Sequence, residues 1–273
     1  MNLLFEEKGT MPSVEEIQSK LKEKGYESVS IGAPGKNGTM FLALPAITAD
    51  LADRKDEPFQ LIITDYLEVK EPFGNETDRS QFWGTKNGSE LLDSCKWHIL
   101  IGDFMSFQHN CFTRAQINSD LLEICLELLP NCKAVWFNSS KNVMTADNAK
   151  NNPYSGALRI FHGAVKERVF FIDKTDEVIV DTIGLHAYGV ADMQFHFKQL
   201  NVSKIVSLAL DCAIYQFENN SPIENYHTIE GFDELGNRQA EIHWRCQYEM
   251  AILEPERMVL DVNTGKIAGG ERK

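Results

Sequence analysis

Hydrophobic positions in this chain repeat with the period of a helix in some segments and alternate as in a strand in others. Residues 13–25 predict a helix, because their apolar positions share one face and Ser13 with Glu16 forms an S-x-x-E capping box. Alternation over residues 26–31 and a more continuous apolar run over residues 39–47 predict two strands. Because a turn-rich segment separates them, we expect a hairpin.

The next strongly periodic segment follows Thr113. Thr113 and Gln116 are predicted to form a second capping box, the following apolar residues repeat at helical spacing, and Pro130 marks the end of the predicted helix. Two other segments predict helices, at 89–94 and 202–217.

Runs rich in β-branched and aromatic residues predict further strands. They lie at 59–69, 97–104, 133–138, 168–173, 178–183, 193–197, 240–253 and 258–262. Strands and helices do not alternate strictly, so a doubly wound parallel sheet is not favoured. The pattern predicts an α+β fold with mixed or antiparallel sheets and flanking helices, and two ferredoxin-like lobes are one form of it.

The domain organisation is predicted from a change in composition near the middle of the chain. Residues 139–153 are rich in Asn, Ser and Lys and are expected to connect an N-terminal α+β lobe, 1–138, to a C-terminal one, 154–265. Residues 266–273 are expected to form a frayed tail. We expect the two lobes to pack as one integrated domain.

The net charge of −13 argues against nucleic acid as a partner, because phosphate binding requires a basic surface. Two interpretations stay open: the charge serves solubility, or it attracts a basic protein partner. No stretch reaches the roughly 20 apolar residues of a membrane helix, and the first residues lack the features of a signal peptide. The six cysteines show no paired spacing and lie in apolar runs, so reduced thiols and a cytoplasmic location are expected.

The glycine-rich string GAPGKNGT, residues 32–39, invites comparison with a phosphate-binding loop. The pattern G-x-x-x-x-G-K-[ST] would need glycine at Ser30 and a hydroxyl residue at Asn37, and a helix should follow. A strand-like run follows instead. A hairpin turn is therefore the favoured interpretation.

Two imidazoles and a carboxylate lie close together in residues 183–197, where His186, Asp192 and His196 could hold a metal ion or move a proton. Their spacing matches no zinc signature, and a further ligand would have to come from elsewhere. In the predicted strand, His196 lies on the face opposite Met193. We therefore expect a structural role for all three, with no catalytic, cofactor-binding or metal-ligating residue assigned.

An acidic segment lies between residues 218 and 241, with aromatic residues interleaved. Its candidate contacts for a basic partner are Glu224, Glu230, Asp233 and Glu234. The alternative is a solvated loop with a hairpin at the sequence LGN.

Five strings follow one another along the chain: PSVEEIQSKL, GTMFLALPAI, KAVWFNSSKNVM, DTIGLHAYGVADMQFHF and YHTIEGF. In this order they resemble a bacterial family known as domain of unknown function 4261. The chain departs from the family pattern at Ala191, where a proline is common. The resemblance implies one architecture over residues 1–273 and supplies no catalytic residues. A looser analogy links the chain to proteins of bacterial contact-toxin and immunity loci.

These observations favour a non-catalytic cytoplasmic binding module that acts through an acidic surface, with an immunity-like or regulatory role and no cofactor. Two alternatives place a site near residues 183–197. One is a metal-assisted hydrolase, and the other is a sensor of a small molecule. The oligomeric state is left open by the sequence.

Overall fold

The computed structural model describes residues 1–32, 38–233 and 237–270, and the chain divides into two compact units, Met1–Ala164 and Val165–Lys273. In each unit helices flank a largely antiparallel sheet, so the predicted α+β class is confirmed. None of the described helices is long and apolar enough to cross a lipid bilayer. All six cysteines are buried free thiols.

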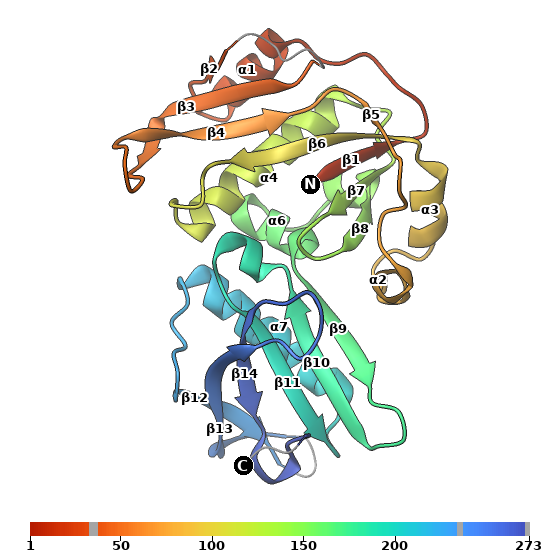
Figure 1. Ribbon diagram of the computed structural model, residues 1–273, viewed down its shortest axis with the longest axis vertical. Coiled ribbons are helices and arrows are strands. Elements are labelled where there is room, and N and C mark those ends of the chain that lie inside the picture. Colours follow the sequence, from red (N-terminus) through yellow and green to blue (C-terminus); the bar gives the residue numbers. More distant parts are fainter. Residues whose placement is uncertain (33–37, 234–236, 271–273) are drawn as a thin grey trace. The chain divides into compact units, whose positions relative to one another are not determined.

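The described strands of the first unit form one antiparallel sheet in the order β2-β3-β4-β6-β1-β7-β8, with β5 beside β6 (Figure 1). Its elements are β1 (Asn2–Phe5), α1 (Val14–Glu23), β2 (Val29–Ser30), β3 (Met40–Ala49), β4 (Glu57–Ile63), β5 (Leu67–Glu68), α2 (Glu76–Ser80), α3 (Gly88–Ser94), β6 (Trp97–Phe104), α4 (Cys111–Leu128), β7 (Ala134–Phe137), β8 (Asn142–Thr145), α5 (Ala146–Lys150) and α6 (Gly156–Ala164).

The capping residues fix where the first two long helices begin. At α1 the predicted capping box is confirmed, because the Ser13 hydroxyl accepts the Glu16 N–H and the Glu16 carboxylate accepts the Ser13 N–H. At α4 the box predicted at Thr113 is wrong. The helix begins at Cys111, and the Asn110 side chain accepts the N–H of the next helical residue at 2.8 Å. An Asn cap three residues earlier takes the role assigned to Thr113.

The predicted hairpin pairing is confirmed by the antiparallel contact of β2 with β3. Residues 33–37 of the glycine-rich string lie outside the described residues, and the predicted hairpin turn and the rejected phosphate-loop interpretation fall mostly on them.

The sequence pattern missed β1, an interior strand of this sheet. β1 pairs with both β6 and β7, and its residues Leu3, Leu4 and Phe5 are fully buried. A four-residue apolar run is too short to show a period. The expected connector, residues 139–153, contains β8 and α5 and lies inside the first unit.

The described strands of the second unit form a sheet in the order β12-β13-β14-β11-β10-β9, where only β11 and β14 are parallel (Figure 1). Its element order differs from the β-α-β-β-α-β order of a ferredoxin-like lobe. The elements are β9 (Lys166–Phe171), β10 (Glu177–Ile183), the 3₁₀ helix η1 (Leu185–Tyr188), β11 (Asp192–Lys198), α7 (Val202–Glu218), β12 (Thr228–Phe232), β13 (Arg238–Met250), β14 (Met258–Asn263) and the 3₁₀ helix η2 (Gly265–Ile267).

The two faces of this second sheet are chemically different. Apolar residues of β11, including Phe195 and Phe197, are fully buried, and α7 packs against β9, β10 and β11. As predicted, Gln194 and His196 lie on the opposite face. This polar face is also covered, because Gln194 is fully buried and His196 nearly so.

Two segments cover the polar face. The strand predicted over 240–253 ends at Met250, and residues 251–257 leave the sheet and fold back across it. Residues 268–270 of the expected frayed tail are bonded to the sheet, with the Gly269 N–H donating to the His196 carbonyl at 2.8 Å. The remaining tail residues, 271–273, lie outside the described residues.

The contact between α6 and β7 gives a direct test of the first unit's core. A Cβ atom on Gly163 would lie 2.2 Å from the Phe137 ring, which is fully buried. We expect Gly163→Ala to lower the free energy of unfolding by about 1–3 kcal/mol in denaturant titrations, although alanine favours helices. Gly84→Ala is the control, because a Cβ atom there would have no described atom within 4 Å apart from its chain neighbours. Equal stability of the two variants would contradict this packing.

Candidate functional site: a buried ion network and an open groove

A row of polar residues crosses the polar face of the second sheet. By strand register, Arg168 of β9 is followed by Asp181 of β10, Gln194 of β11, Asp261 of β14 and Gln247 of β13. The Gln194 amide donates to the Asp261 carboxylate at 2.9 Å. Four members of the row are buried, namely Arg168, Asp181, Gln194 and Asp261. Buried polar groups are costly unless they are hydrogen-bonded, so these four require partners within the protein.

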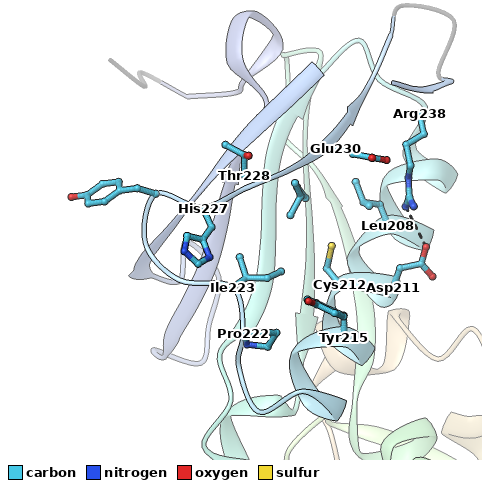
Figure 2. Close-up of a pocket in the computed structure, with 12 residues that line it drawn as sticks. Leu208, Asp211, Cys212, Tyr215, Pro222, Ile223, His227, Thr228, Glu230 and Arg238 are labelled. Carbon is cyan, nitrogen blue, oxygen red and sulfur yellow. Dashed lines mark hydrogen bonds and ion pairs between the residues drawn. The ribbon is translucent and has the colours of Figure 1, made fainter. Parts of the chain in front are cut away.

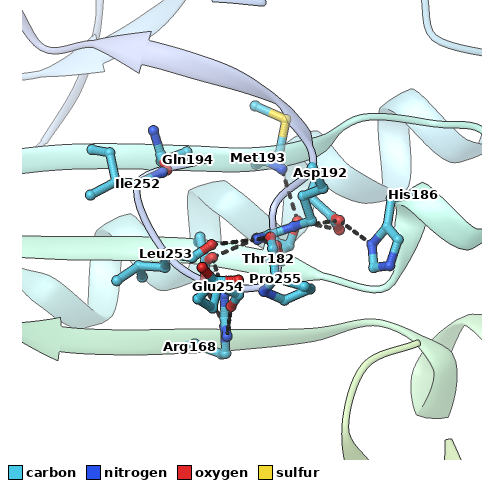
Figure 3. A network of polar contacts seen from close by, with 12 residues as sticks. Arg168, Thr182, His186, Asp192, Met193, Gln194, Ile252, Leu253, Glu254 and Pro255 are labelled. Carbon is cyan, nitrogen blue, oxygen red and sulfur yellow. Dashed lines mark hydrogen bonds and ion pairs between the residues drawn. The ribbon is translucent and has the colours of Figure 1, made fainter. Parts of the chain in front are cut away.

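Those partners form an ion network around two buried carboxylates (Figure 3). Asp181 accepts the Arg168 guanidinium through both carboxylate oxygens, at 2.9 and 2.6 Å, and accepts Arg257 at 2.6 Å. Arg257 also donates to Asp192 at 3.1 Å. The other end of the network is His186, whose Nδ1 lies 2.8 Å from the same Asp192 oxygen.

Residues 251–257 cover the network and form hydrogen bonds with it. The Glu254 carbonyl accepts Arg168 at 2.8 Å, and two further carbonyls of the segment accept Arg257. The Ile252 N–H donates to the Gln194 amide oxygen at 2.8 Å. Residues that would otherwise be a loop on the surface are therefore tied to the sheet through the charged side chains beneath them.

The composition of the network indicates a structural role. Its arginines and aspartates balance in charge, and their multiple hydrogen bonds offset the cost of burying them. Asp192 is saturated, since it also accepts the Leu185 N–H at 3.0 Å and the Thr182 hydroxyl at 3.3 Å. Only the His186 imidazole, 31% exposed, reaches solvent from this network.

The predicted candidates in residues 183–197 do not all meet. His186 and Asp192 are paired, whereas His196 Nε2 lies 2.9 Å from the Glu177 carboxylate. The Gly270 N–H and the Lys198 ammonium lower the pKa of Glu177, so it is ionised beside His196. Within the described part of the chain, no three His, Cys, Asp or Glu side chains gather as metal ligands.

The sequence pattern missed Arg168, Asp181 and Arg257. One signal was available, because a charged residue inside an apolar strand run, such as Asp181 in EVIVDTI, must find a buried partner. The identity of that partner could not be predicted, since Arg257 is 76 positions away along the chain.

A groove of about 900 Å³ opens elsewhere in the second unit, between α7 and the chain that leads into and along β12 (Figure 2). Its apolar lining includes Leu208, Cys212, Ile223 and Ile229. Burial raises the pKa of the Cys212 thiol to about 11, so at neutral pH this thiol is protonated and a poor nucleophile. The groove can therefore hold a ligand but presents no activated sulfur.

Charged residues line the groove beside this apolar surface. Asp211 of α7 and Glu230 of β12 are among them, together with Arg238 of β13. Arg238 lies 3.4 Å from Asp211, and both side chains are largely exposed (Figure 2).

The four predicted partner-binding acids have different environments. Glu230 lines the groove, and Glu224 is exposed on the loop before β12. Asp233 accepts the Asn237 N–H at 2.8 Å and the Gln239 amide at 2.7 Å, so it stabilises the β12–β13 connection. Glu234 lies outside the described residues.

Removing one arginine tests whether the ion network supports the second unit. We expect Arg257→Met to lower the free energy of unfolding by about 3–5 kcal/mol, because it leaves two buried carboxylates short of a partner. Arg245→Met is the matched control, since Arg245 is exposed and stacks on Tyr226 at 4.3 Å. A loss of about 1 kcal/mol or less is expected there. Similar losses in thermal or denaturant unfolding of the two variants would contradict the network's role.

Comparison with known proteins finds one relationship. Neither the search of curated proteins nor that of solved structures gave a match. The segment matched by a family model, residues 181–263, contains Asp181, Asp192 and Arg257 of the ion network and all the residues that line the groove. Residues 181–263 match the family model of a domain of unknown function, DUF4261, so the resemblance seen in the sequence is confirmed for this part of the chain.

Proposed function

We propose that this chain is a non-catalytic binding module that holds a basic protein partner in the groove between α7 and β12. The observation that supports this most is the composition of the groove, an apolar surface bordered by acidic side chains. Apolar contacts at the centre of an interface contribute affinity, and charges at its rim contribute orientation and association rate.

The charges favour a cationic partner. The net charge of the chain is −13, so a basic protein is attracted before contact is made. At the groove itself, the two carboxylates Asp211 and Glu230 outnumber the single arginine of the lining, Arg238, so a lysine or arginine of the partner would balance the charge. Covering a basic surface of another protein suits an immunity-like or regulatory role.

The two alternatives near residues 183–197 draw less support. A metal-assisted hydrolase would need His186, Asp192 and His196 at one ion, but His196 is paired with Glu177 instead. A small-molecule sensor would need a hollow beside these residues, whereas the covering segment 251–257 is bonded directly to the network.

A synthetic peptide can test the charge preference. The probe is a fluorescent peptide of about nine residues that alternates lysine and valine, and the control replaces each lysine with glutamate. In fluorescence anisotropy with the full chain, we expect the lysine peptide to bind and the glutamate peptide not to. Binding of the lysine peptide should weaken as NaCl rises from about 50 to about 300 mM, because salt screens the rim charges. Equal binding of the two peptides would contradict the proposal.

Charge-removing variants locate the binding surface. We expect Glu230→Gln and Asp211→Asn each to weaken binding of the lysine peptide about two- to fivefold, the range of exposed charge pairs. Asp173→Asn is the matched control, because Asp173 is exposed in the same unit and does not line the groove. If all three variants bound equally well, the peptide would lie elsewhere and the groove would not be the site.

A further inference from the structure

We propose that the partner's basic segment binds as an extra strand along the free edge of β12; this inference rests on the proposed function. It specifies the occupant of the groove as an extended segment that alternates cationic and apolar residues. The evidence comes from the position of β12 in the sheet, the course of the groove, its helical wall and its charge.

The edge of β12 is open to pairing. Among the described residues, β12 is the last strand of its sheet and pairs with β13 alone. A terminal strand presents a row of backbone N–H and C=O groups on its outer side, and such an edge is a template for another strand.

The groove runs along β12 and touches residues that point to both faces of the strand. Thr228, Ile229 and Glu230 are consecutive residues of β12, and all three line the groove. Successive side chains of a strand point to opposite faces, so a hollow that touches all three must run beside the backbone. The backbone groups of the edge are therefore accessible from within the groove.

The opposite wall is a stripe of α7. Leu208, Asp211, Cys212 and Tyr215 line the groove, and their spacing of three, four and seven residues places them on one helical face. Tyr215 is half exposed, with a fractional exposure of 51%, although α7 is otherwise packed on the sheet. A strand beside β12 would turn alternate side chains toward this wall, where apolar ones would contact Leu208 and Tyr215.

The negative charge of Glu230 favours a cationic partner segment at this edge. A cation on the added strand opposite Glu230 is stabilised, whereas an anion there is destabilised. For the same reason, pairing of two copies of this chain through their β12 edges is disfavoured, because each copy brings the negatively charged Glu230. The favoured occupant is a basic segment of a different protein.

A bulge limits the length of the usable edge. The register of β12 with β13 shifts between Glu230 and Gly231. A side chain at Gly231 would overlap the Trp244 ring, which approaches within 2.5 Å of the Cβ position, so this close approach requires glycine. Pairing is therefore expected over Thr228–Glu230, and the rest of the partner segment is held by side chains.

Backbone methylation of the probe separates strand addition from simple charge attraction. The alternating lysine–valine peptide is compared with the same peptide N-methylated at its central amides, which keeps every charge and side chain. Strand addition predicts at least about tenfold weaker binding of the methylated peptide to the full chain, since two or more backbone hydrogen bonds are lost. A peptide methylated only at its terminal amides is the control and should bind like the parent.

Hydrogen exchange supplies a second readout. Binding of the parent peptide should slow amide exchange in residues 228–232, and the centrally methylated peptide should not. If both peptides bind equally and exchange in β12 is unchanged, strand addition is wrong while the proposed basic-partner function stands. If neither lysine peptide binds even at low salt, the proposed function fails, and strand addition fails with it.

Discussion

The interaction on which the second unit depends is the position of the Arg257 guanidinium between two buried carboxylates. Asp181 and Asp192 lie on neighbouring strands, and each accepts a hydrogen bond from Arg257. Without this cation, Asp181 would be left with Arg168 and Asp192 with His186, so two buried carboxylates would be incompletely compensated. Arg257 also binds carbonyls of its own segment, so one side chain fixes both the strands and the chain that crosses them.

This constraint links the polar face of the sheet to the groove. The covering segment 251–257 joins β13 to β14. Its hydrogen bonds to the network therefore fix the position of the end of β13. β12 is held in turn by its pairing with β13. On the other face, α7 is held by apolar contacts with β9, β10 and β11. The groove thus lies between two elements that are positioned by different forces, an ion network on one face and hydrophobic burial on the other.

Local patterns in the sequence predicted much of this fold. β6 has the predicted bounds, and α7 extends one residue beyond its predicted end, because both have a clear period and distinct flanks. β1 was missed, since a four-residue run has no measurable period. The alternation in β11 placed His196 on the correct face, but it could not indicate that residues 251–257 and 268–270 cover that face. Such covering depends on contacts between distant segments.

The candidate site was predicted only in part for the same reason. Glu230 was identified from the local density of acids, and it does line the groove. The helical wall of the groove, with Asp211 and Tyr215, was not identified from the sequence, because the pattern of α7 shows only an apolar helix. Likewise, His186 and Asp192 are close in sequence and meet in the structure, whereas Arg257, the charge partner of Asp192, lies 65 positions away and carries no local signal. Contacts between residues that are close in sequence can be predicted from the sequence, but a pairing across 65 positions cannot.

The most direct measurement is a crystal structure of the full chain with the lysine–valine peptide bound. We expect the peptide to lie beside β12 as an extended strand, with a lysine near Glu230 and with the Arg257–Asp192–His186 contacts unchanged. A peptide, ion or other ligand bound at the His186 imidazole, with the β12 edge empty, would contradict the assignment of the network as scaffold and of the groove as the binding site.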